Sequence, residues 1–101
     1  MDGIHEGHRA RMKKKLLENG ERSLADHELL EVLLYYAIPR RDTNELAHRL
    51  LKQFGSLRGV LSAPVQELAC VSGVGQQAAL LLGMVPMLCR RAAQREKEQI
   101  L

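Results

Sequence analysis

Apolar residues recur every three or four positions along most of this chain, which is the spacing of one face of an α-helix. No segment alternates apolar and polar residues as a half-buried strand does. The pattern predicts helices over residues 9–19, 23–37, 43–53, 57–61, 64–70 and 75–91. We therefore expect an all-α protein, a compact bundle of about five or six short helices.

The apolar positions also predict which face of each helix is buried. The helix over 23–37 is apolar around most of its circumference, so we expect it to be the central and most buried one. The helices over 9–19, 43–53 and 75–91 should each bury one stripe of apolar residues. The stripe consists of Ala10, Met12, Leu16 and Leu17 for the first helix, of Leu46, Ala47, Leu50 and Phe54 for the second, and of Ala78, Leu81, Val85 and Leu88 for the third.

Capping residues and prolines mark the helix ends. The sequence Ser-Leu-Ala-Asp beginning at Ser23 resembles a capping box, and Asp42 is expected to cap the helix that follows it. Pro39 should end the preceding helix, because the residue before a proline is driven out of the α conformation. Pro86 lies inside the last helix and predicts a kink there or a break near Gly83.

Two glycines one residue apart, Gly73 and Gly75, separate the last two predicted helices. Glycine tolerates positive φ and puts no side chain between the backbone and a ligand. The amides of Gly73, Val74 and Gly75 can then point outward together at the positive end of a helix, a phosphate site that Gln76 and Gln77 can assist. The alternative is a tight turn that needs small residues only for packing. We favour the phosphate site, because two glycines around one valine exceed what a plain turn needs.

Composition narrows the class of protein. The chain has 101 residues, 46% of them hydrophobic but only 3% aromatic, so few rings are available to stack on unpaired bases. No apolar run approaches the roughly 20 residues that span a bilayer, and the N-terminus lacks a signal-peptide core. We expect a soluble, cytoplasmic protein with no membrane partner. Cys70 and Cys89 fall in apolar helical patterns and are expected to be buried free thiols.

Positive charge is unevenly distributed, although the formal net charge is only +3. One basic run holds five cations and no acid, namely Arg9, Arg11, Lys13, Lys14 and Lys15. Two further basic spots comprise Arg40 with Arg41, and Arg90, Arg91 and Arg95 with Lys97. Such asymmetry favours a polyanionic partner. Solvated helix faces are the alternative, and the first run could also bind a partner protein.

Catalytic chemistry has little support in this sequence. His27 and His48 have no nucleophile nearby, and no group of cysteines and histidines has the spacing of a zinc site. Glu28 and Glu31 share a helix face, but paired acids on a helix are usually solvated. We therefore expect no enzyme activity, no cofactor, no bound metal and no small-molecule substrate.

Several short motifs together resemble the N-terminal region of RadC-like proteins. They lie in order at residues 7–11, 28–34, 38–42, 47–51, 54–57 and 71–75, and the resemblance covers roughly residues 5–92. Such proteins carry a DNA-repair label and usually continue into a JAMM-type metal-dependent hydrolase-like domain, whose zinc site needs a His-x-His pair. This chain has no His-x-His, so the resemblance implies no metal or peptidase chemistry in these residues.

The resemblance and the helix order together imply a double helix-hairpin-helix bundle, like SAM domains and domain 2 of RuvA. The first hairpin is degenerate, because Ile-Pro-Arg-Arg at residues 38–41 replaces the glycines. We expect a basic N-terminal helix and lead-in over 1–22, the double helix-hairpin-helix domain over 23–92, and a polar extension or linker over 93–101.

The predicted function is weak, salt-sensitive and sequence-independent binding to the DNA backbone. Gly73, Val74 and Gly75 would hold one phosphate, assisted by Gln76 and Gln77. Electrostatic attraction would come from Arg40, Arg41, Arg9, Arg11 and Lys13 to Lys15. Gln76 and Gln77 stand where DNA-binding hairpins commonly carry Lys or Arg, which removes charge from that spot. The alternative is a protein-interaction module whose last helix, at Met84 and Met87, forms a dimer or interdomain surface.

Overall fold

The computed structural model describes residues 3–100, and the side chains of residues 7–95. Its elements are α1 (Gly3–Asn19), the 3-10 helix η1 (Glu21–Ser23), α2 (Asp26–Tyr35), α3 (Thr43–Phe54), α4 (Leu57–Ser62), α5 (Val65–Ala69) and α6 (Gly75–Ile100). The described residues contain no strand, so the prediction of an all-α bundle is confirmed. The side chain of Lys97, one of the predicted basic residues, lies outside the described residues.

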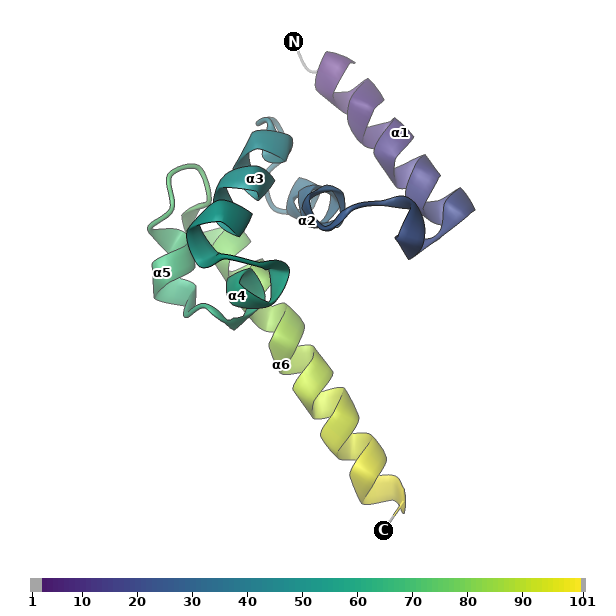
Figure 1. The fold of residues 1–101 in the computed structure, drawn as a ribbon, viewed down its shortest axis with the longest axis vertical. Coiled ribbons are helices and arrows are strands. Elements are labelled where there is room, and N and C mark those ends of the chain that lie inside the picture. Colours follow the sequence, from purple (N-terminus) through teal and green to yellow (C-terminus); the bar gives the residue numbers. More distant parts are fainter. Residues whose placement is uncertain (1–2, 101) are drawn as a thin grey trace.

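Two helix pairs build the globule (Figure 1). α2 packs against α3, α5 packs against α6, and α4 joins the pairs because it contacts α2, α3 and α6. α1 packs against α2, and the second half of α6 projects away from the globule (Figure 1). None of the described helices combines the length and the apolar character that a membrane span requires. The predicted polar extension over 93–101 continues α6 as far as Ile100.

Each helix of the globule contributes at least one large, fully buried aliphatic side chain to the core. These side chains are Leu34, Leu50, Val60, Leu68 and Leu82. α2 also buries Leu30, Val32 and Tyr35, which confirms it as the central helix. Aliphatic burial of this kind supplies most of the folding free energy, at roughly 25 cal/mol for each Å² of apolar surface removed from water.

The predicted faces of two helices need correction. In α1, Met12 is buried as expected, but Ala10 and Leu17 face solvent. α6 buries Ala78, Ala79 and Leu82, whereas Leu88 is 62% exposed. Leu88 lies in the second half of α6, beyond the turns that pack in the core, which leaves its side chain largely uncovered. Helical periodicity identifies an apolar stripe, but the position of the neighbours decides how much of that stripe is buried.

The predicted break near Gly83 does not occur, because α6 continues through Pro86. Gly83 has a packing role instead: a Cβ atom there would come within 2.5 Å of Val65 Cγ2. The missing side chain therefore lets α5 and α6 pack closely. Pro86 cannot donate the helical hydrogen bond of an ordinary residue at its position.

Local hydrogen bonds confirm one predicted cap and correct another. The Asp42 carboxylate accepts the backbone N–H groups of the first turn of α3, at 3.0 and 3.4 Å. Ser23 does not cap α2, because its hydroxyl donates to the Gly20 carbonyl at 2.7 Å. Ala25 occupies the cap position and its N–H donates to Glu28 Oε1 at 2.9 Å. Alanine has no side-chain acceptor, so only the glutamate half of a capping box exists.

Cys70 and Cys89 are free thiols, as expected, but both are exposed. The prediction that they are buried is therefore wrong. Cys70 follows the last residue of α5, and Cys89 lies in the second half of α6. At both places the apolar pattern continues beyond the packed core.

A buried carboxylate joins α1, α2 and α3. Glu31 of α2 is only 1% exposed. Its Oε2 atom accepts hydrogen bonds from the Tyr35 hydroxyl at 2.7 Å and from His8 Nε2 at 2.9 Å, and its Oε1 accepts from Asn44 Nδ2 at 2.9 Å. An ionised carboxylate can only accept, so His8 is the donor in its contact. The expectation that Glu28 and Glu31 are both solvated is wrong for Glu31.

The electrostatics of this cluster keep Glu31 ionised. Burial alone would raise the pKa of Glu31, but the hydrogen bonds from Asn44, Tyr35 and His8 outweigh burial and hold that pKa below its ordinary value. Burial, reinforced by the hydrogen bond to Glu31, raises the pKa of Tyr35, so this hydroxyl remains a donor. Three helices are thus joined by charge-assisted hydrogen bonds to one buried carboxylate.

Replacing Glu31 with Gln tests this cluster. The substitution keeps the shape of the side chain but removes its charge. It also places an amide N–H donor among side chains that themselves donate hydrogen bonds to this position. We expect it to lower the free energy of unfolding by about 2 kcal/mol near neutral pH, the usual size of a hydrogen bond to a charged group. Because the pKa is lowered on folding, the contribution of Glu31 is present above the ordinary value of 4.5 and is lost as the pH falls through the lower folded value.

Urea unfolding followed by circular dichroism, repeated at several pH values, measures both effects. Glu67→Gln is the matched control, because Glu67 is exposed on α5 and should change stability by less than about 0.5 kcal/mol. The difference between the parent and Glu31→Gln should shrink in acid. Equal stability of the two variants at neutral pH would contradict the role assigned to Glu31.

Candidate nucleic-acid interface

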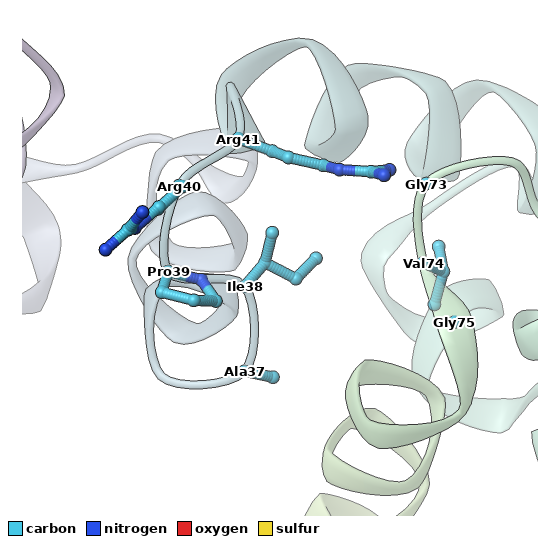
Figure 2. A pocket seen from close by; sticks show the side chains of 8 residues that line it. All are labelled: Ala37, Ile38, Pro39, Arg40, Arg41, Gly73, Val74 and Gly75. Atoms are coloured by element: carbon cyan, nitrogen blue, oxygen red, sulfur yellow. The ribbon is translucent and has the colours of Figure 1, made fainter. Parts of the chain in front are cut away.

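Two turns line one groove at an end of the helix pairs (Figure 2). One turn joins α2 to α3, and the other joins α5 to α6. The groove has a volume of about 360 Å³ and is lined by Ala37, Ile38, Pro39, Arg40, Arg41, Gly73, Val74 and Gly75. The structure therefore brings together both predicted hairpins, which lie far apart in the sequence.

Both glycines of the second turn adopt left-handed backbone conformations that other residues rarely take. The φ angle is +92° at Gly73 and +72° at Gly75. A Cβ atom at Gly73 would lie 3.3 Å from Arg49 Nη2 and 3.7 Å from Arg41 Nη1. Glycine at this position therefore allows two guanidinium groups to approach the backbone of the turn.

Arg41 and Arg49 reach Gly73 from different elements. Arg41 extends from the first turn toward Gly73, whereas the side chain of Arg40 points away from it (Figure 2). Arg49 comes from the middle of α3, where its Nε also lies 3.9 Å from Glu45 Oε1. Two like charges beside one backbone segment create a local positive potential, which an anion would neutralise.

Sequence reasoning did not identify Arg49 as a site residue. Its local context is an ordinary exposed helix position with an acid four residues earlier, a pattern typical of a solvated salt bridge. Only the packing of the second turn against α3 gives Arg49 its neighbour Gly73.

The backbone N–H groups of the second turn differ in whether they already have a hydrogen-bond acceptor. Val74 N–H donates to the Val71 carbonyl at 3.0 Å, and the Val74 side chain is 5% exposed. Val74 therefore closes the turn and anchors it in the core, rather than offering its amide to a ligand. The amides of Gly75, Gln76 and Gln77 begin α6 and have no acceptor within that helix. The glutamine side chains are exposed at this positive helix end.

Arg9, another predicted DNA contact, is hydrogen-bonded to other parts of the chain. Its guanidinium donates to the Tyr35 carbonyl at 3.3 Å and to the Arg41 carbonyl at 2.9 Å. It also lies over the Tyr35 ring, with its central carbon 4.6 Å from the ring centre. Arg9 thus connects α1 to the turn that carries Arg41.

The remaining cations of α1 lie outside the groove. Lys13 Nζ lies 5.6 Å from the centre of the Tyr36 ring, and Lys14 Nζ lies 4.0 Å from Glu18 Oε1. Arg11 and Lys15 are exposed on the same helix. None of these four residues lines the groove between the two turns.

The histidines that appeared isolated in the sequence contact each other. The rings of His27 on α2 and His48 on α3 stack with their centres 4.2 Å apart and their planes inclined by 28°. This contact adds to the packing of α2 against α3. Neither residue lines the groove.

Comparison with known proteins gives a family match. The model of the UPF0758 N-terminal family matches residues 5–80 of the chain. UPF0758 protein FN0909 of Fusobacterium nucleatum subsp. nucleatum is 36% identical over 99 residues, which cover 95% of this chain and 43% of that protein. The chain therefore spans less than half the length of this curated relative. No solved structure matches the chain.

Proposed function

The chain belongs to the UPF0758 family, the RadC-like family that its motifs resemble, and from this premise we propose that it binds DNA through phosphates without reading the bases. In this proposal α2 with α3 and α5 with α6 act as the two units of a double helix-hairpin-helix module. The observation that carries the proposal is the convergence of Arg41 and Arg49 on the left-handed backbone of Gly73. Because the relative is longer, the module would bring an attached domain to DNA.

The groove has the chemistry that a phosphate diester needs. Guanidinium groups donate paired hydrogen bonds to phosphate oxygens, and the first amides of α6 add donors at a positive helix end. Arg41 and Arg49 supply, from neighbouring elements, the charge that Gln76 and Gln77 lack. Phosphate contacts set the position and the affinity but carry no sequence information, so the binding should be non-specific.

The family match also bears on catalysis. It lies within the N-terminal region of the UPF0758 family, and the groove residues are cations, glycines and apolar side chains. We propose a binding module rather than an enzyme, because this set contains neither a general base nor a nucleophile.

Charge reversal at the two arginines beside Gly73 tests DNA binding. We expect Arg41→Glu and Arg49→Glu each to weaken binding to duplex DNA, measured by fluorescence anisotropy at 50 and 200 mM salt. The plot of log K against log salt should lose about 0.9 of slope for each phosphate contact removed. Duplex, single-stranded and branched DNA are titrated in parallel, because a backbone contact should tolerate all three.

Arg58→Glu is the matched control, since Arg58 is exposed on α4 and, unlike Arg41 and Arg49, is not among the nearest neighbours of Gly73. Substitution of Gly73 is a poorer test, because a side chain there would both strain the backbone and displace Arg49. If the parent binds no DNA at low salt, or if both Arg41→Glu and Arg49→Glu bind like Arg58→Glu, the proposed function is wrong.

A second candidate function rests on the projecting helix. Leu80, Met84, Met87 and Leu88 of α6 are 42–62% exposed and recur at helical spacing. The last three, with Arg91, line a hollow of about 230 Å³. Exposed apolar stripes of this kind mark protein contacts. As the alternative to DNA binding, we propose that the module pairs with a second copy of itself along this stripe.

In an antiparallel pair centred on Met84, Leu80 of one copy would face Leu88 of the other. Met84→Lys should then abolish dimerisation in sedimentation velocity runs over a wide concentration range. Leu17→Lys is the control, because Leu17 is 86% exposed on α1, away from the stripe. A parent protein that stays monomeric at every concentration excludes this candidate.

A further inference from the structure

We infer that Arg9 positions Arg41 and does not itself contact phosphate, an inference that rests on the proposed binding of DNA in the groove. Arg9 is a cation in the basic run of α1, where charge alone favours a direct contact. Its guanidinium instead donates hydrogen bonds to backbone carbonyl groups at the turn between α2 and α3.

The Arg9 guanidinium holds both ends of the turn between α2 and α3. Tyr35, whose carbonyl it reaches at 3.3 Å, is the last residue of α2. Arg41, whose carbonyl it reaches at 2.9 Å, precedes the Asp42 cap of α3. One planar group with several donors in fixed directions can satisfy two carbonyl groups in this way. Arg9 therefore ties both ends of the turn to α1.

Arg9 is itself held in place by its neighbours. Its guanidinium lies over the Tyr35 ring at 4.6 Å, and the Tyr35 hydroxyl donates to buried Glu31 at 2.7 Å. His8, the preceding residue, also donates to Glu31 at 2.9 Å. These contacts fix both the face and the donor edge of the guanidinium.

By holding the turn, Arg9 determines the direction of the Arg41 side chain. Pro39, Arg40 and Arg41 form an exposed turn on the surface, where backbone freedom would let Arg41 leave the groove. Holding the Arg41 carbonyl fixes the direction in which its side chain starts, which is toward Gly73 (Figure 2). Preorganisation of this kind reduces the entropy lost when an anion binds.

Arg9→Lys separates positioning from direct electrostatic contact. It keeps the charge but cannot bridge two carbonyl groups with one planar fork. At 50 mM salt we expect Arg9→Lys to weaken duplex binding about fivefold, the size of a coupling between contacting groups. Arg22→Lys, at an exposed residue of η1, is the control and should bind like the parent.

A double-mutant cycle with Arg41→Met gives the second arm. If Arg9 acts through Arg41, Arg9→Lys should weaken binding less than about twofold once Arg41 is already removed. Equal weakening in both backgrounds, or full binding by Arg9→Lys alone, would overturn the inference.

A measurement without DNA distinguishes this inference from the proposed function. Nuclear spin relaxation should show faster motion of the residue 40–42 amides in Arg9→Lys than in the parent, with the Leu50 and Leu82 amides unchanged. If the parent binds no DNA, the proposed function fails, while the relaxation data still test whether Arg9 orders the turn. Unchanged motion of the turn would refute positioning, whatever the DNA result.

Discussion

The buried carboxylate of Glu31 is the interaction on which the rest of the structure depends. Its side chain accepts hydrogen bonds from all three N-terminal helices, at His8, Tyr35 and Asn44. The Glu31 backbone carbonyl accepts a further bond from Thr43 Oγ1 at 3.3 Å. The start of α3 is therefore tied to Glu31 through two successive residues. Removing an ionised group from water is costly unless its partners are complete, so this cluster favours one arrangement of α1, α2 and α3.

That arrangement determines the shape of the groove between the two turns. The first turn leaves α2 one helical turn after Glu31 and enters α3 at Thr43, so both of its ends are set by the carboxylate cluster and by Arg9. Arg41 of the first turn and Arg49 of α3 then both reach Gly73. The phosphate site that we propose is thus assembled from three separate parts of the chain. The second turn therefore lies beside two cations, although the residues after its second glycine are neutral.

The sequence predicted the features that depend on local chemistry. Helical periodicity located the helices, Asp42 was expected as the cap of α3, and the motifs identified the family. The burial of Glu31 was not predicted, because two of its donors come from other helices, 23 and 13 residues away in the chain. Arg49 was missed for the same reason. The exposed Leu88 and the continuous helix through Pro86 depend on where α6 leaves the globule, which periodicity does not encode.

The most direct test of the proposed groove is an NMR titration of the isotope-labelled chain with a short duplex at low salt. Amide and guanidinium signals report which residues meet the DNA. The account predicts shifts at Gly73, Gly75, Gln76 and the Arg41 and Arg49 side chains, which reverse when salt is added. Shifts confined to the exposed cations of α1 or to the stripe on α6, with the groove signals unmoved, would contradict it.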